Sequence, residues 1–169
     1  EHCELVFHVA SKAGIWGSYN DYFQSNVVGA KNVVEACKQN AVKSLIYTST
    51  PSVIYHSGGV EGVNESVAYP ETFKSHYAET KAQAEAFILA QNSKTLKTVA
   101  LRPHLIWGPY DPHFVPRLAQ RSKSGRFAFL GTGNYLVDHI YVENAALAHW
   151  CAAEKLINEN EEQHVAGRA

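Results

Sequence analysis

Short apolar runs alternate along the first 100 residues with segments of helical periodicity. Three such runs predict buried strands, because each is short, almost continuously apolar and bounded by polar or turn residues. The strands are expected at Leu5–Ala10, Ser44–Ser49 and Thr98–Arg102, and the helices between them at residues 20–40 and 75–91. Strands that alternate with helices are typical of a parallel sheet covered by helices, so the pattern predicts an α/β fold.

The pattern changes near residue 104, where Pro, Trp and Arg become frequent. The sequence predicts a ring-rich loop at 107–112, a helix at 116–123, a short strand at 127–130, a strand that closes at Tyr141 and a helix at 143–156. We therefore expect a sheet domain at 1–103. Residues 104–169 are expected to be a mixed region that contributes a substrate-facing part and returns to the main domain.

Composition excludes several classes of protein. The chain has 169 residues, 46% of them apolar, and its 15 basic and 16 acidic side chains leave no electrostatic footprint for nucleic acid. No apolar stretch is long enough for a membrane span. Three separated cysteines favour a reducing, cytoplasmic setting, and the nine histidines show no ligand spacing, so no metal is expected. The chain contains no methionine and begins at Glu1, so we expect an internal piece of a longer protein, and membrane association through missing segments stays open.

Tyr77 and Lys81 are the strongest candidates in the sequence for a catalytic pair. Four residues apart on a predicted helix, they share one face. An ammonium beside a phenol favours the phenolate, but lowering a tyrosine pKa from about 10 to about 7 needs roughly 4 kcal/mol. A lysine together with the positive ring of an oxidised nicotinamide in a dry cleft would supply it. The alternative interpretation is a solvated helix face.

Hydroxyl groups follow the second predicted strand, in the stretch Thr48–Ser52, and the third strand ends at Leu101-Arg102-Pro103. Ligands of parallel sheets bind beyond the carboxyl ends of the strands. A hydroxyl there, opposite the helix with Tyr77 and Lys81, completes a proton-relay set. The hydroxyl would bind the substrate oxygen, Tyr77 would transfer the proton and Lys81 would bind the cofactor ribose.

These motifs resemble the extended short-chain dehydrogenase/reductase superfamily along nearly the whole chain. The stretches that carry the resemblance are His8–Ser11, Asn26–Cys37, Thr48–Thr50, Tyr77 with Lys81, Leu101–Pro103, Ile106–Pro112 and Asp138–Asn144. The last two resemble the 3β-hydroxysteroid dehydrogenase branch, which has epimerase/dehydratase relatives. The resemblance implies a Rossmann-type parallel sheet with helices on both faces, and NAD or NADP as cofactor, with NAD favoured.

The resemblance also implies roles for individual residues. Tyr77 is the expected acid/base and Lys81 its partner on the cofactor ribose. Thr50, or less closely Ser49, matches the hydroxyl that orients the substrate. The remaining matches are Ala10 and Ser11 where the backbone passes the cofactor, Pro103 against the nicotinamide, and Asn26 as a structural residue.

One departure from the family pattern stands out, because the glycine-rich loop that follows the first strand of the family is absent. Neither residues 14–17, nor 58–62, nor 131–133 have its spacing and context. We therefore expect the N-terminal glycine-rich βαβ unit, and the residue that selects NAD or NADP, to lie upstream of Glu1.

Three functions remain open. The first is an NAD(P)-dependent oxidoreductase of a secondary alcohol, such as a sterol-like or long-chain hydroxy substrate, with Trp16, Trp107 and Tyr110 lining an apolar pocket. The second is a nucleotide-sugar epimerase or dehydratase that uses bound NAD. A basic cluster motivates it, although a solvated helix face is the alternative; the cluster comprises Arg117, Arg121, Lys123 and Arg126. The third is a non-catalytic cofactor-binding relative.

A homodimer through the helices at 20–40 and 76–92 is also expected. Small residues at Ala30, Ala82 and Ala86 would let two such helices approach closely. The alternative is that these residues pack against the sheet of their own chain.

Overall fold

The computed structural model describes residues 3–14, 16–56, 59–111, 114–125, 128, 132–134, 136–158 and 165–169. They fall into two compact units. The first unit comprises Glu1–Arg102 with His149–Ala169, and the second unit comprises Pro103–Ala148. Each unit is described by itself below.

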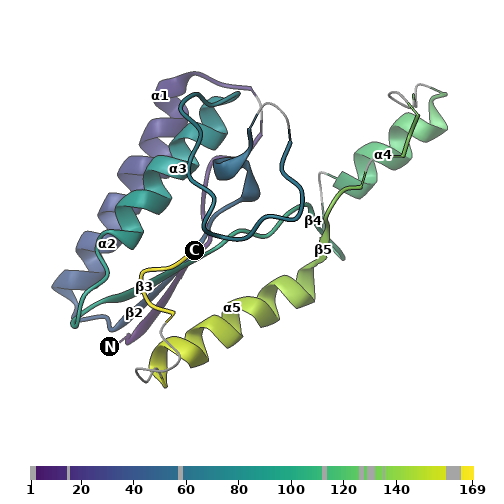
Figure 1. Ribbon diagram of the computed structural model, residues 1–169. Helices are drawn as coiled ribbons and strands as arrows, with labels where there is room; N and C mark the ends of the chain where they lie inside the picture. Colours follow the sequence, from purple (N-terminus) through teal and green to yellow (C-terminus); the bar gives the residue numbers. More distant parts are fainter. Residues whose placement is uncertain are drawn as a thin grey trace. The chain divides into compact units, whose positions relative to one another are not determined.

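A three-stranded parallel sheet forms the centre of the first unit (Figure 1). Its strands lie in the order β1 (Leu5–His8), β2 (Ser44–Thr48) and β3 (Lys97–Leu101). All three predicted strands are confirmed, each within one or two residues of its expected ends. β2 is buried along its whole length, whereas β1 forms one edge of the described sheet and leaves Phe7 39% exposed. The prediction that both faces of β1 are covered is therefore wrong for the described residues.

The first long helical segment is not one regular α-helix. It comprises α1 (Tyr19–Tyr22), the π-helix η1 (Phe23–Val28) and α2 (Gly29–Gln39). The apolar stripe at 27–37 predicts the helix but not its π-helical turn, which widens the backbone spiral locally. Ser18 begins the segment with a capping box, in which its hydroxyl and the Asp21 carboxylate bond reciprocally to backbone N–H groups.

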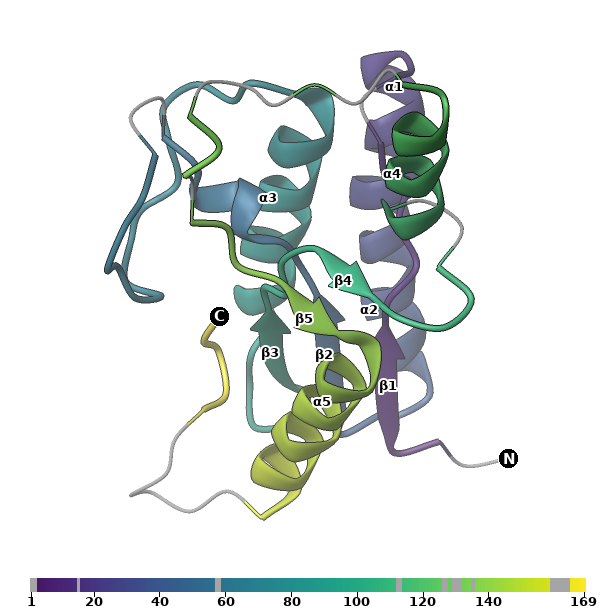
Figure 2. The same ribbon diagram turned by 90° about the vertical axis from the view of Figure 1, so that its right-hand side faces the viewer.

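Helices cover both faces of the sheet. On one face, α2 and α3 (His76–Leu89) lie side by side, as Figures 1 and 2 both show. They pack on Leu45 and Tyr47 of β2 in one apolar cluster. On the opposite face, Ile46 packs in a second cluster with the C-terminal part of α5 (Val142–Ile157). Because successive strand residues point to opposite faces, β2 alone supplies both clusters, and the predicted two-sided α/β arrangement is confirmed.

Residues 165–169 run beside β3, which the sequence did not predict. The Gly167 N–H donates to the Thr98 carbonyl at 2.6 Å, and the Ala100 N–H donates to the Arg168 carbonyl at 3.0 Å. This segment therefore extends the hydrogen bonding of the sheet beyond β3.

The second unit contains α4 (Phe114–Lys123) and a small parallel pair, β4 (Ile106–Trp107) and β5 (Ile140–Tyr141). β4 includes Trp107, the first residue of the loop expected at 107–112, whereas residues 108–111 lie in neither a helix nor a strand. Gly108 follows β4 at φ 158°, and a Cβ there would lie 2.5 Å from the Val142 side chain, so only glycine fits. The strand expected at 127–130 lies, apart from residue 128, outside the described residues.

Two of the three small residues expected at a dimer interface are buried inside the chain. Ala30 is 0% and Ala82 3% exposed, and each lies in an apolar cluster of its own unit, whereas Ala86 is exposed. Packing within the chain therefore accounts for both residues, since Ala30 packs with the sheet and Ala82 packs with Val53 and Ile54. Among the described residues, no helix has the length and apolar character needed to cross a membrane.

Candidate functional site

Three polar side chains follow one another at four-residue steps along α3: Tyr77, Lys81 and Glu85. Such spacing places them along one face of the helix. That face is turned inward, because Lys81 is 1% and Glu85 0% exposed. The helix begins at an N-cap, Ser75, whose hydroxyl accepts from the Ala78 N–H at 3.2 Å. The interpretation of the Tyr77/Lys81 pair as a solvated helix face is therefore wrong.

Lys81 is held at the carboxyl end of β2. Its Nζ donates to the Thr48 carbonyl at 2.6 Å and lies 4.1 Å from the centre of the Tyr47 ring. Burial lowers the pKa of Lys81 to about 8, because the ammonium loses its hydration, while the Glu85 carboxylate acts in the opposite direction.

Tyr77 lies near the same segment, at Thr50, two residues after Thr48. The Thr50 side chain, which is 7% exposed, lies close enough to Tyr77 to act on its phenol. Burial raises the pKa of Tyr77, and Thr50 opposes part of that rise. The sequence pattern led us to expect a phenol pKa lowered by Lys81, but in the described structure burial dominates and the Lys81 ammonium is directed to the Thr48 carbonyl. A lowered pKa would need the additional positive ring of a bound cofactor.

The hydroxyl stretch after β2 turns into a short 3-10 helix, η2 (Pro51–Ile54). Thr50 caps this helix, since its hydroxyl accepts from the Ser52 N–H at 3.3 Å. Ser49 is 4% exposed, and its Oγ has no hydrogen-bond partner among the described residues. A buried hydroxyl without a partner is costly, so this position suits a polar group of a ligand.

The loop after β1 is tied to α3 through Asn26 of η1. The Asn26 Oδ1 accepts from the Lys12 N–H at 2.7 Å, and its Nδ2 donates to the Lys12 carbonyl at 3.2 Å and to the Thr80 hydroxyl at 3.1 Å. These contacts are those of a structural residue. Ala10 and Ser11, just before the clamped Lys12, are exposed at the carboxyl end of β1, where a ligand can reach them.

A cavity of about 400 Å³ opens beside Tyr77. Its lining consists of Gly14, Tyr22, Phe73, Lys74, Ser75, His76, Tyr77 and Glu79. The three rings expected to form an apolar pocket do not line it. Trp16 is 85% exposed in the first unit, whereas Trp107 and Tyr110 are 37% and 101% exposed in the second, so an apolar pocket lined by all three stays a prediction.

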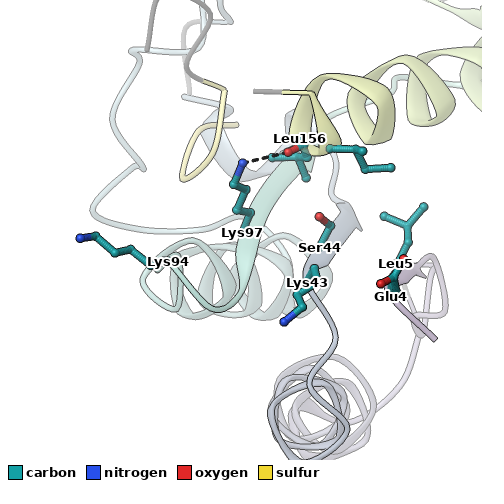
Figure 3. A pocket seen from close by; sticks show the side chains of 8 residues that line it. Glu4, Leu5, Lys43, Ser44, Lys94, Lys97 and Leu156 are labelled. Carbon is teal, nitrogen blue, oxygen red and sulfur yellow. Dashed lines mark hydrogen bonds between the residues drawn. The ribbon is translucent and has the colours of Figure 1, made fainter. Parts of the chain in front are cut away.

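A second cavity, of about 290 Å³, lies at the opposite, amino ends of the strands (Figure 3). Three lysines line it: Lys43, Lys94 and Lys97. Their ammonium groups point in different directions, and Lys97 donates to the Leu156 carbonyl at 3.0 Å. The lysines therefore do not converge on one point where an anion would sit.

The remaining predicted residues have simpler outcomes. Pro103 is the first residue of the second unit, so its role beside the nicotinamide stays a prediction. Arg117 and Arg121 are exposed on α4, while Arg126 lies outside the described residues. No cluster of potential metal ligands occurs in the described part of the chain.

Sequence reasoning missed two contacts of the site. The Thr48 hydroxyl lies 2.7 Å from Nε2 of His149, which is 101 residues away, and no local pattern indicates such a pair. Glu85 continues the four-residue spacing of Tyr77 and Lys81, so that periodicity is a signal that could have found it.

These residues together can hold an oxygen between two hydroxyls, move a proton and present a buried cation. Tyr77 and Lys81 both contact the segment 47–50, and the unpartnered Ser49 hydroxyl lies in the same segment. The residues present therefore fit the nicotinamide and ribose part of a dinucleotide cofactor, at the strand ends where parallel sheets bind ligands.

Comparison with solved structures defines the class of protein. A UDP-N-acetylglucosamine 4-epimerase from Methanobrevibacter ruminantium matches with a TM-score of 0.74 and 29% identity, over 89% of this chain and 51% of that chain. A Thermus thermophilus UDP-glucose 4-epimerase in complex with NAD matches with a TM-score of 0.68 and 32% identity, over 88% and 52%. These similarities place the chain in the extended short-chain dehydrogenase/reductase class, which is built on a Rossmann-type fold.

Within that class, the chain belongs to the 3-beta hydroxysteroid dehydrogenase/isomerase family, whose model matches residues 1–169. It is 50% identical over 161 residues to a 2-alkyl-3-oxoalkanoate reductase of Shewanella oneidensis, covering 91% of this chain and 42% of the relative. It is 37% identical over 158 residues to the human decarboxylating sterol-4-alpha-carboxylate 3-dehydrogenase, covering 92% and 42%. The chain therefore spans less than half the length of these relatives.

Proposed function

We propose that this chain supplies the catalytic part of an NAD(P)-dependent oxidoreductase that interconverts a secondary alcohol and a ketone, with Tyr77 as the acid/base. The observation that carries the proposal is the placement of Tyr77. It lines the 400 Å³ cavity, contacts Thr50 and lies one turn before a buried lysine. A phenol between a cavity and a hydroxyl is placed to exchange a proton with a substrate oxygen.

Each residue has a defined task in this proposal. Thr50 orients the substrate oxygen toward Tyr77, and Ser49 is the second hydroxyl available in that segment. Tyr77 accepts the hydroxyl proton when an alcohol is oxidised and returns a proton when a ketone is reduced. Lys81 holds the cofactor ribose and favours the phenolate. NAD(P), when bound, supplies the hydride acceptor or donor.

The cofactor assignment includes two further segments. Ala10 and Ser11 would form the backbone passage beside the cofactor, and Pro103 would lie against the nicotinamide. The structures in complex with NAD support NAD as the favoured cofactor.

The names of the relatives suggest a narrower substrate class. A 2-alkyl-3-oxoalkanoate carries its ketone on the second carbon from a carboxylate, and a 4-carboxylate sterol oxidised at carbon 3 has the same relation. We therefore propose a β-hydroxy or β-keto carboxylate with a large apolar remainder, which includes the sterol-like and long-chain hydroxy substrates expected from the sequence.

A nucleotide-sugar epimerase or dehydratase with retained NAD is the second candidate. The epimerase structures at 29–32% identity favour it, as does the exposed basic cluster on α4. The 50% identity to a reductase makes the oxidoreductase the stronger proposal.

Turnover assays with the full-length protein separate the two candidates. Accumulation of NAD(P)H with a long-chain 3-hydroxy carboxylate, or its consumption with the 3-oxo form, is the expected result. Conversion of a UDP-sugar without net reduction of NAD would instead establish the second candidate. Binding of NAD without either reaction, together with unaffected binding in Tyr77→Phe, would establish the non-catalytic relative.

A homodimer through the helical segments at 20–40 and 76–92 remains part of the proposal. Since Ala30 and Ala82 are buried within the chain, Ala86 on the exposed side of α3 is the residue that would allow close approach. Ala86→Arg should convert a dimer to a monomer in sedimentation analysis, and a wild-type monomer at micromolar concentration would contradict the dimer.

A further inference from the structure

A buried network lies one turn beyond Lys81 on α3. The Glu85 carboxylate is completely buried and accepts from Arg102, whose Nε lies 3.2 and 3.1 Å from its two oxygens and whose Nη2 lies 2.5 Å from Oε1. The Tyr69 hydroxyl donates to the same Oε1 at 2.7 Å. The carboxylate thus receives bonds from two separate elements: the segment that precedes α3 and the end of β3.

Three hydrogen-bond donors from two residues converge on the Glu85 carboxylate. A bidentate arginine and a phenol are the kind of partners that stabilise a buried carboxylate. The Arg102 side chain is 11% exposed, and its Nη1 is buried without a partner among the described residues.

The groups that face Lys81 from other elements are neutral at neutral pH. Burial and the nearby Lys81 lower the pKa of His8 in β1, so its ring is uncharged. Burial raises the pKa of Tyr47 in β2, so its phenol keeps its proton. On α3 itself, Tyr77 is likewise protonated, because burial raises its pKa. Glu85 is therefore the group that supplies a negative charge to Lys81.

We propose that Glu85 is a positioning residue for the reaction: fixed by Arg102 and Tyr69, its carboxylate keeps the buried Lys81 side chain in the ammonium form that the site uses. The inference rests on the function proposed for Lys81. Lys81 is held by the Thr48 carbonyl, and Glu85 is its neighbour one turn along the same buried face. Arg102 and Tyr69 hold the Glu85 carboxylate in place.

The first experiment measures Lys81 itself in the full-length protein, without added cofactor. Side-chain NMR of ¹⁵N-lysine-labelled protein, with the signal assigned by Lys81→Arg, follows the titration between pH 6 and 10. Glu85→Gln should shift the Lys81 midpoint down by about one pH unit, because the opposing charge is gone. Since Glu85→Gln leaves Arg102 without its carboxylate, the double variant Glu85→Gln/Arg102→Gln provides a neutral pair in case the single variant does not fold.

Two matched controls define the specificity of the shift. Glu35→Gln removes a carboxylate from the exposed face of α2 and should leave the midpoint in place. Tyr69→Phe removes one hydrogen bond but not the charge, and should also leave it in place. Unchanged midpoints in both Glu85 variants would overturn the proposal.

The second experiment measures NAD⁺ binding by calorimetry at pH 6.5 and 8.5. Wild type and Glu85→Gln should bind alike at pH 6.5, whereas at pH 8.5 the variant should bind at least about threefold more weakly. Parallel loss at both pH values would show a purely structural role and overturn the proposal. If wild-type protein binds neither NAD⁺ nor NADP⁺, the proposed function fails, and the NMR titration still decides whether Glu85 controls Lys81.

Discussion

The two ends of the central sheet differ in how their charged groups are held. At the amino ends of the strands, Lys43 and Lys94 are exposed and their ammonium groups diverge (Figure 3). At the carboxyl ends, Lys81 and Glu85 are buried and each is fixed by hydrogen bonds to a different element. A cavity lined by positively charged side chains is therefore not by itself a functional site. Preorganised groups at a defined point are what chemistry needs.

The largest effect should come from removing the proton donor at the carboxyl end. Tyr77→Phe keeps the ring but not the hydroxyl, so turnover of the full-length protein should fall by about 10²- to 10⁴-fold. Tyr110→Phe, which alters a fully exposed ring, is the control and should keep wild-type turnover. Turnover is measured by NAD(P)H absorbance. Near-normal turnover of Tyr77→Phe would show that the carboxyl end of the sheet does not use Tyr77 as its proton donor.

A large loss of stability is expected when the hydrogen bonds from the Asn26 side chain to the loop after β1 are removed. Asn26→Ala leaves the Lys12 N–H and carbonyl without their partner, and should lower the free energy of unfolding by about 2–3 kcal/mol. Urea unfolding checks this value. Asn40→Ala serves as the control, because Asn40 is exposed and makes one bond, to the Ala36 carbonyl. An equal loss in the free energy of unfolding for the two variants would show that the Asn26 side chain does not stabilise the loop after β1.

The pH dependence of stability tests the burial of Lys81. Its pKa is about 8 when folded and 10.5 when unfolded, so between these values the unfolded chain binds the extra proton and stability rises with pH. Lys81→Met removes this contribution. Its stability relative to wild type should therefore fall by about 2 kcal/mol between pH 7 and 9.5.

Denaturant unfolding at the two pH values measures this difference. Lys94→Met accounts for the general effect of losing one ammonium, because Lys94 is exposed at the amino end. If the two variants show the same pH dependence, Lys81 is not distinguished by its burial.

The smallest effect is expected at the amino-end cavity. The double variant Lys43→Ala/Lys94→Ala removes two exposed charges that do not converge, and should change the free energy of unfolding by less than about 0.5 kcal/mol. Turnover should stay at the wild-type value. A loss of turnover or of cofactor affinity in this variant would show that the amino-end cavity is a functional site after all.

Local patterns predicted the framework of the first unit well. The apolar runs at 5–10, 44–49 and 98–102 became the three parallel strands, because short buried strands need continuous apolar sequence. The helices on both faces followed from the alternation of strands and helices. Patterns failed where the outcome depended on distant packing, as for the exposed Phe7 and for β4, whose two residues are extended through pairing with β5.

The residue types proposed for the chemistry follow from the amino-acid sequence alone: a phenol and an ammonium four residues apart on a helix, and hydroxyls after a strand. Their environment depends on the tertiary fold. That fold buried Lys81 and Glu85, directed the ammonium to the Thr48 carbonyl and raised the pKa of Tyr77. The physical reason is that spacing along a helix follows from local geometry, whereas desolvation and charge pairing depend on residues that folding brings from far along the chain.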